Sequence, residues 1–402
     1  MLTGMGPSKS LIYAGSTAAG AGIANNYALT SGTSPVIAVS GSILYTTSFQ
    51  NKSYNGGTFS GMWVYIPSNT RVTDTLIRFI NNSVVGNQIL TIPAGATGFF
   101  ADITNTDTVA AGDEYAIGVT FPVGGYTINI SQLGMIYSDS SGNYVSKYCG
   151  IGTAALNNLT RYTGMAGNSG AGAVAAAEGT QQTTIKAAGT IKNLAIRSYA
   201  NSHTSDFTYT VRVNGVNSGL TVTVPASTLG LFEDTSNTVA VVAGDLVTIE
   251  TRAGASTGTL NSVIGLDYES SELATVTGSL SGSLSGVTPG SGKYFRTNCS
   301  GVTNLLQIQA QLYITGTITI KNPRVRIWTN GHNAVSTWTL QKNGVDTAVV
   351  LSVPATTTGE FVDSVNTVDV VAGDLVNWKL DMPGAGNATV FSMAFDVEDP
   401  TP

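Results

Sequence analysis

Hydrophobic and polar residues alternate along most of the chain with the period of two that is typical of β-strands. The segment DFTYTVRV (residues 206–213) alternates apolar residues with threonine and arginine, so one face of the predicted strand is buried. Asn214-Gly215 follows and predicts a tight hairpin turn, because both central residues of such a turn need positive φ. The next segment, GLTVTVP, alternates again until Pro225, which lacks the N–H group that a central strand donates. These residues therefore predict a β-hairpin.

Helical periodicity is scarce by comparison. The segment GAVAAAEG, residues 172–179, is the best helical candidate, yet it is short and is flanked by glycine-rich sequence. We interpret it as an inserted loop, because it lengthens the start of the second repeat relative to the third. The sequence therefore predicts a chain built almost entirely of strands.

One strand-turn-strand phrase occurs three times. NTVAVVAGDLV (237–247) and NTVDVVAGDLV (366–376) agree at ten of eleven positions and lie 129 residues apart, and NTDTVAAGDEY (105–115) is a looser copy. Each copy closes on a glycine-aspartate pair: Gly112-Asp113, Gly244-Asp245 and Gly373-Asp374. We expect each glycine to supply a left-handed backbone and each aspartate to fold its carboxylate onto nearby amides. These are structural turn residues that define the repeat.

A period near 130 residues is much longer than a solenoid repeat, so each copy is expected to be a domain with its own core. We predict domain 1 at residues 1–140, including an N-terminal arm of about forty residues. Domain 2 is predicted at 141–275, and domain 3 at 276–402, including a Gly/Ser-rich linker at 278–292. The predicted fold class is all-β, with three tandem jelly-roll-like β-sandwich domains.

The residues around the Gly-Asp turns resemble a known family. In domain 2, GDLV (244–247) is followed about twenty residues later by VIGL (263–266), and in domain 3 GDLV (373–376) precedes FSMAF (391–395), without the glycine. This pattern resembles the tumour-necrosis-factor/C1q-like jelly roll. Similar Gly-, Thr- and Asn-rich modules occur in bacteriophage virion proteins of the head-fibre, decoration and tail types. The resemblance implies a trimer that binds partners and catalyses nothing.

Composition narrows the range of partners. Charged residues make up 10% of the chain and the net charge is −6, with no run of Lys or Arg, so a nucleic-acid groove is not expected. No apolar segment approaches the ~20 residues of a membrane span, and the interrupted apolar start does not favour a signal peptide. Cys149 and Cys299 stand at non-equivalent positions and are expected to be idle. Such a chain is typical of a particle protein that is assembled inside a cell and freed by lysis.

The two histidines are the strongest candidates for chemistry. His203 and His332 occupy equivalent loops, each four residues after an aromatic residue, Tyr199 or Trp328. Three interpretations are open: solvent-facing turn residues, a metal site at a threefold axis, and an aromatic-histidine loop that contacts sugar or protein. No second ligand accompanies either histidine. We therefore predict no metal and treat the four residues as candidate partner-contact loops.

Paired carboxylates form a second set of candidates. Asp267 with Glu269, and Asp396 with Glu398, lie two residues apart and therefore on one strand face. A glycosidase needs two carboxylates that flank the scissile bond. Both pairs close their domains, however, and we interpret them as charges that protect a strand edge from pairing.

Each repeat also carries an aspartate followed three residues later by asparagine: Asp102, Asp234 and Asp363. Calcium is the alternative use for these oxygens, although no calcium-binding loop accompanies them. Neither a nucleophile elbow nor a phosphate-binding loop occurs. We therefore predict no enzyme activity and no cofactor. Three tryptophans fall on buried strand positions and are expected in cores: Trp63, Trp338 and Trp378.

Together these features predict a non-enzymatic virion structural protein, either a capsid decoration, a head fibre or a tail-associated component. Its expected partners are other virion or coat subunits, further copies of itself (a trimer by analogy) and host-surface glycan, with no nucleic acid and no membrane insertion. Two alternatives are a secreted bacterial surface filament or adhesin subunit, and the carbohydrate-binding module of a glycan-active protein. In each case tandem domains multiply weak contacts through effective concentration.

Overall fold

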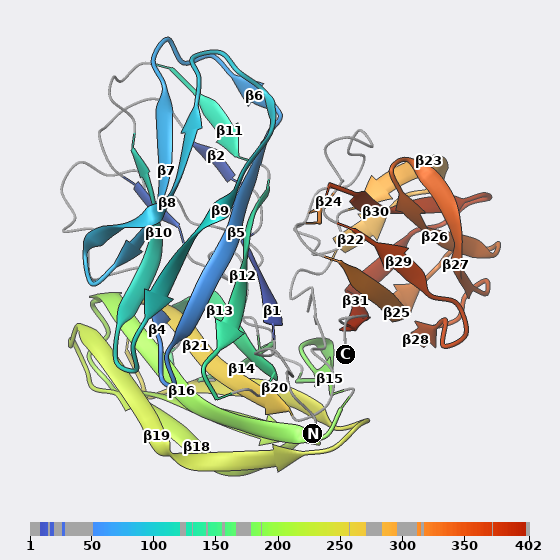
Figure 1. Ribbon diagram of the computed structural model, residues 1–402. Coiled ribbons are helices and arrows are strands. Elements are labelled where there is room, and N and C mark those ends of the chain that lie inside the picture. Colours follow the sequence, from blue (N-terminus) through green and yellow to red (C-terminus); the bar gives the residue numbers. More distant parts are fainter. Residues whose placement is uncertain are drawn as a thin grey trace, which may run out of the picture. The chain divides into compact units, whose positions relative to one another are not determined.

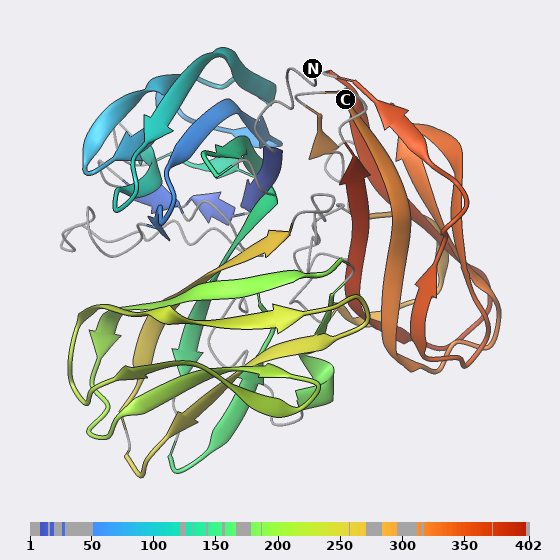
Figure 2. The ribbon, with the colours of Figure 1, turned by 60° about the horizontal axis from the view of Figure 1, so that its bottom comes forward.

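The part of the chain that the structure describes folds almost entirely into β-strands, as the computed structural model in Figures 1 and 2 shows. The structure describes residues 9–14, 17–19, 26–28, 51–120, 126–130, 132–141, 144–154, 157–165, 178–185, 187–256, 258–270, 284–295, 312–314, 317–371 and 373–398. The one helical element among them is the single 3-10 turn η1 (Glu178–Thr180). It includes the end of the predicted helical candidate, whose other residues lie outside the described ones. The all-β fold class is confirmed.

The chain divides into two compact units, Met1–Glu272 and Leu273–Pro402. The first unit holds two β-sandwiches, named domain 1 (strands β1 to β12) and domain 2 (β13 to β21). The second unit holds one β-sandwich, named domain 3 (β22 to β31).

Domain 1 has two main sheets and a small third sheet. The strand order of the first is β1 (Lys9–Ala14), β12 (Gln132–Asp139), β5 (Gly57–Ile66) and β9 (Gly98–Val109). The second has the order β3 (Asn26–Ala28), β10 (Glu114–Thr120), β7 (Thr75–Asn81) and β8 (Val84–Ile92), and β4 (Asn51–Lys52) also pairs with β10. The small sheet contains β2 (Thr17–Ala19), β11 (Ile128–Ile130) and β6 (Ser68–Asn69).

Domain 2 repeats the two main sheets. The first has the order β13 (Tyr144–Ala154), β21 (Leu260–Ser270), β16 (Gly189–Asn201) and β19 (Gly230–Val241). The second has the order β14 (Thr160–Thr163), β20 (Leu246–Ala253), β17 (Phe207–Val213) and β18 (Val216–Val224), and β15 (Thr183–Thr184) also pairs with β20.

Domain 3 follows the same scheme with one interruption. Its first sheet has the order β22 (Leu284–Val287), β31 (Ala388–Glu398), β25 (Ile318–Asn330) and β28 (Gly359–Val362), and β29 (Val368–Val370) also pairs with β25. Its second sheet has the order β23 (Gly290–Phe295), β30 (Leu375–Met382), β26 (Ser336–Lys342) and β27 (Val345–Val353), with β24 (Leu312–Tyr313) on β30. The strand that is continuous as β9 and β19 is therefore split into β28 and β29.

All three domains share one topology. When the eight main strands of a domain are numbered along the chain, one sheet reads 1-8-3-6 and the other reads 2-7-4-5. This is the strand order of a jelly roll, in which two Greek keys interlock. The predicted fold of three tandem jelly-roll-like sandwiches is confirmed.

Two segments that the sequence set aside as arm or linker contain sheet strands. β1 and β3, from the first forty residues, pair with β12 and β10. β22 lies inside the predicted linker 278–292 and pairs with β31, so the linker prediction is wrong for that stretch. Glycine and serine have little strand propensity of their own, and here the neighbouring strand supplies the hydrogen-bonding partner.

Aromatic and aliphatic side chains fill the space between the two main sheets. In domain 1 the ring of Phe59 lies 4.8 Å from that of Phe79 and 4.6 Å from that of Tyr115, measured between centroids. Full burial of each such side chain contributes roughly 1.5–3 kcal/mol. Trp338 and Trp378 are buried in domain 3, as predicted.

Trp63 is also fully buried, but it lies outside the core between the sheets. Its neighbours Met62 and Val64 belong to that core, and the Trp63 ring packs on the outer side of the sheet, against Gly134. A Cβ at position 134 would stand 2.5 Å from the indole, so only glycine leaves room for it. Trp63 is buried as predicted, but the expectation that it lies in the core is wrong, because its side chain is on the opposite face of the strand.

Candidate interaction surfaces

One end of each sandwich is closed by an aspartate and an asparagine. In domain 2 the Asp245 carboxylate accepts the Val242 N–H at 2.8 Å and the Asn214 side-chain amide at 2.8 Å. Asn214 Oδ1 in turn accepts the Leu246 N–H at 2.9 Å. The hydrogen bond from Val242, followed by that from Asn214, lowers the pKa of Asp245. We name this end of each domain the clasp end.

The clasp is the same in the other two domains. Asp113 accepts the side-chain amide of Asn82 at 2.7 Å, and Asp374 accepts that of Asn343 at 2.6 Å. The glycines that precede the three aspartates have φ of 96°, 96° and 97°: Gly112, Gly244 and Gly373. This left-handed backbone turns each carboxylate back toward the strand before it.

The hairpin turn beside the clasp has positive φ at both central residues in every domain. The values are 52° and 79° at Asn214-Gly215, and the third domain has the same Asn-Gly sequence. In domain 1 the turn is Asn82-Ser83, with φ of 47° and 67°. Sequence reasoning missed the turn of domain 1, because serine seldom adopts a left-handed backbone.

The aspartates considered for calcium join strands 5 and 6. Asp234 on β19 accepts the N–H groups of Thr221 on β18 (3.0 Å), Ser236 (3.2 Å) and Asn237 (3.0 Å). Burial by itself raises the pKa of Asp234, but these bonds and the Asn237 side chain hold it below its ordinary value. Asp102 and Asp363 make the equivalent contacts. The carboxylates thus face N–H donors, which is the opposite of a cation site.

The two histidines are fully buried, so the solvent-facing interpretation is wrong. His203 Nδ1 lies 2.9 Å from the Ser205 carbonyl oxygen, and its ring meets Phe207 edge-on at 4.4 Å. His332 Nδ1 lies 3.0 Å from the Ala385 carbonyl oxygen. Tight loops explain the burial, because each histidine carbonyl also accepts an N–H from the turn after strand 5.

The aromatic residues paired with them lie in strands rather than loops. Tyr199 on β16 is half-buried, and burial raises its pKa. Trp328 belongs to β25. Because both histidines are buried, neither imidazole is exposed next to Tyr199 or Trp328. The contact role of these four residues stays a prediction.

An asparagine in front of each histidine loop is a repeat residue that sequence reasoning missed. Asn201 Oδ1 accepts the His203 N–H, and its amide donates to the carbonyls of Pro225 and Thr228. Asn69 and Asn330 do the same in domains 1 and 3. The signal was present, since each asparagine stands 24 residues before the repeated proline.

In domain 1 the place of the histidine is taken by Arg71. Its N–H donates to Asn69 in the same way, its side chain is 3% exposed, and its guanidinium donates to the Tyr126 carbonyl at 3.1 Å. This loop position is therefore filled by a buried polar side chain close to a backbone carbonyl in all three domains, an arginine in one and a histidine in two.

The predicted edge role of the acid pairs is wrong. β21, which carries Asp267 and Glu269, pairs with β13 on one side and β16 on the other, so it is a central strand. Asp267 is buried and accepts the Asn193 amide at 2.9 Å, and Glu269 pairs with Lys192. The other pair, Asp396 and Glu398, lies on β31, the equivalent central strand.

Within the first unit, the clasp end of domain 1 contacts the outer face of the 1-8-3-6 sheet of domain 2. Lys52 Nζ lies 3.0 Å from Glu233, and the Tyr54 hydroxyl donates to the same carboxylate at 2.6 Å. Arg197 donates to Glu114 at 2.6 Å. Burial, followed by the bond to Glu233, raises the pKa of Tyr54 well above its ordinary range.

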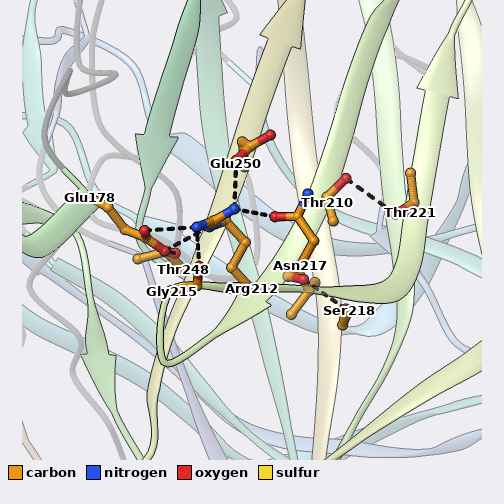
Figure 3. Close-up of polar contacts among 10 residues, drawn as sticks. Glu178, Thr210, Arg212, Gly215, Asn217, Ser218, Thr221, Thr248 and Glu250 are labelled. Atoms are coloured by element: carbon orange, nitrogen blue, oxygen red, sulfur yellow. Dashed lines mark hydrogen bonds and ion pairs between the residues drawn. The ribbon is translucent and has the colours of Figure 1, made fainter.

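A polar cluster on domain 2 is centred on Arg212 (Figure 3). Its guanidinium donates to Glu178 through Nε at 2.8 Å and Nη2 at 3.1 Å, and to Glu250 through Nη1 at 2.8 Å. Thr248 donates to Glu178 at 2.9 Å, and the guanidinium stands over the Tyr162 ring at 5.6 Å. The bond with Glu178 raises the pKa of Arg212, whose charge in turn lowers that of Glu178 against the effect of burial. The cluster ties η1 to strands β17 and β20.

No cluster of three or more His, Cys, Asp or Glu side chains with metal-binding geometry occurs among the described residues. None of their helices is long and apolar enough to cross a membrane.

No family model and no curated protein matches the chain. Two solved structures align with it weakly. PNGF-II is 8% identical, covering 86% of this chain and 99% of its own, with a TM-score of 0.18. The Sulfolobus Turreted Icosahedral Virus structure is 11% identical, covering 97% of this chain and 92% of its own, with a TM-score of 0.17. Likeness at these scores supports no inference about fold or function.

Proposed function

We propose that this chain is a non-enzymatic structural protein of a bacteriophage particle, a capsid decoration, head fibre or tail-associated component that acts through protein–protein contacts. The observation that carries the proposal is the docking of one jelly roll on another. Glu233 and Arg197, on the outer face of domain 2, bind Lys52, Tyr54 and Glu114 of domain 1. The repeated module thus has both a docking end and a receiving face.

The topology supports the same proposal. Eight strands in the order 1-8-3-6 and 2-7-4-5 form the jelly roll on which many viral capsid domains are built. The order also agrees with the resemblance to the tumour-necrosis-factor/C1q-like family. Fold alone does not determine function, so the contact surfaces carry more weight than the topology.

The side chains nominated for chemistry have folding partners, which favours a structural role. Asp234 and its counterparts accept backbone N–H groups across two strands. His203 and His332 are enclosed in tight loops, and Asp267 is bonded to Asn193 inside a sheet. We therefore assign recognition to surfaces rather than to a catalytic cleft. The expected partners are coat subunits, further copies of the chain as a trimer, and host-surface glycan.

Particles from the source of this sequence would test the proposal. An antiserum against the recombinant chain should detect the protein in gradient-purified particles, and immunogold labelling should mark the particle surface. Pre-immune serum is the control. Label confined to bacterial surface filaments, with none on particles, would contradict the proposal and favour an adhesin. Glycan-array binding without particle association would favour a carbohydrate-binding module.

A further inference from the structure

The outer face of the 1-8-3-6 sheet already serves as a docking surface in domain 2. Arg197 on strand 3 stands opposite Leu231 on strand 6, and Glu233 follows two residues later on the same side. Arg197 binds Glu114, and Glu233 binds Lys52, both from the clasp end of domain 1. The face therefore combines a cation, an aliphatic residue and an acid.

Domain 3 carries the same three kinds of side chain on this face in another arrangement. Arg326 stands at the place of the arginine, but Glu360 is opposite it where Leu231 would be, and Val362 replaces Glu233. The acid and the aliphatic residue have exchanged places along the strand, a displacement of about 7 Å. Such an exchange preserves the chemistry of the face while changing which partner fits it.

The exchanged residues are accessible. Val362 is 47% exposed, Glu360 is exposed, and Val365, just beyond them, is 84% exposed. Single exposed aliphatic residues are common, but here valine occupies a position at which the sister domain has a charged contact residue. The same position therefore makes a contact in domain 2, as Glu233, and is exposed apolar surface in domain 3, as Val362.

The clasp end of domain 3 matches this face. Lys342 lies there with its side chain 34% exposed, held by Asp374 at 2.9 Å, and domain 2 has Val213 at that position. Beside it, Val345 is 68% exposed and Val371 is 49% exposed. A lysine and two valines at the clasp end complement an acid and a valine on the face, as Lys52 complements Glu233 in the first unit.

We infer that Arg326, Glu360 and Val362 form a docking surface for the clasp end of domain 3 in a second copy of the chain. The inference rests on the proposed function and deepens it by naming the contact. An end-to-face contact is heterologous, so it closes into a ring, such as a trimer, when the rotation permits and otherwise extends into a filament.

Restoring the order found in domain 2 tests the inference with no change in net charge. Glu360→Leu with Val362→Glu recreates the arrangement of domain 2 in the full-length chain. Sedimentation velocity over a concentration series should show assembly of the wild-type chain and an association constant lower by on the order of 100-fold for the double variant. Far-UV circular dichroism should be unchanged, because both residues are on the surface.

Val335→Asp is the matched control, since it also replaces an exposed valine of domain 3 by the residue of domain 2, but beside the histidine loop. It should assemble like the wild type. A monomeric wild-type chain, an unaffected double variant, or an equal loss in the control would each overturn the inference. Particle association is measured separately: protein found on particles without self-association refutes only this inference, and self-association without particles refutes only the proposed function.

Discussion

Domains 2 and 3 share their topology and their turns, yet they differ at the same place on strands 4, 5 and 7. Arg212, Asn217 and Glu250 of domain 2 correspond to Gln341, Asp346 and Lys379 of domain 3. In domain 2 the cation on strand 4 binds the acid on strand 7, whereas in domain 3 the cation on strand 7 binds the acid on strand 5, at 2.8 Å.

Domains 2 and 3 contain two kinds of equivalent position. The clasp has the same residues and the same geometry in both domains, and so does the contact of Asp234 or Asp363 between strands 5 and 6, here named the strand 5–6 bridge. Both features provide hydrogen-bond acceptors for backbone N–H groups that the shared topology leaves unpaired. At the charged positions of strands 4, 5 and 7 only the presence of an ion pair is shared. On strand 7, domain 2 has an acid and domain 3 has a lysine. Domains of one topology therefore carry different surface charges.

The strand 5–6 bridge should show the largest effect, and an equal one in both domains. Asp234→Ala or Asp363→Ala leaves several N–H groups without an acceptor, and each should lower the free energy of unfolding of its domain by about 2–4 kcal/mol. Hydrogen exchange with mass spectrometry resolves the two domains. Asp234→Asn, which keeps one acceptor oxygen, should cost less. A large loss in only one domain would break the equivalence.

The charge clusters should respond differently to salt. Arg212→Ala leaves Glu178 and Glu250 without their cation and should cost about 1–3 kcal/mol at low ionic strength. Gln341→Ala removes a neutral partner of the buried Asn377 and should cost about 1 kcal/mol. Added salt should reduce the first cost and leave the second unchanged. Urea unfolding at two salt concentrations measures both, and an Arg212 effect that is insensitive to salt would contradict the electrostatic assignment.

The contact of Glu233 with domain 1 is specific to domain 2. Domain 3 has Val362 at the equivalent position and so lacks the carboxylate. A double-mutant cycle of Tyr54→Phe and Glu233→Gln should give a coupling energy of about 1 kcal/mol, because the phenol donates to a charged acceptor. The same cycle with Glu250→Gln, which lies in the separate Arg212 cluster, should give none. Coupling in that control cycle instead would mean that the effect is not local.

The clasp should show the smallest effect, visible only in acid. Folding lowers the pKa of Asp113, Asp245 and Asp374, so the folded chain binds fewer protons than the unfolded chain. Their contribution is complete above the unfolded pKa of about 3.9 and is lost as the pH falls through the lower folded values. Asp245→Asn should flatten this part of the stability curve by less than about 1 kcal/mol. An unchanged acid limb would show that the carboxylate is not linked to folding.

Sequence periodicity was sufficient for the strands, the Asn-Gly and Gly-Asp turns and the repeated domains, because these features depend on backbone conformation and on the alternation of side chains between two faces. Sequence reasoning failed where the outcome depended on distant neighbours. The first forty residues and the Gly/Ser-rich stretch carry strands because β12, β10 and β31 offer partners.

The all-β class, the repeat and the local turns follow from the φ preferences and the polarity of adjacent residues, so they can be predicted from the sequence. The enclosure of His203 and His332, the central place of the strand bearing Asp267, and the contact of Glu233 with Lys52 and Tyr54 depend on tertiary packing. In the contact of Glu233, for example, the partners are more than a hundred positions apart in the sequence. A pattern of adjacent residues cannot predict a contact between residues so far apart.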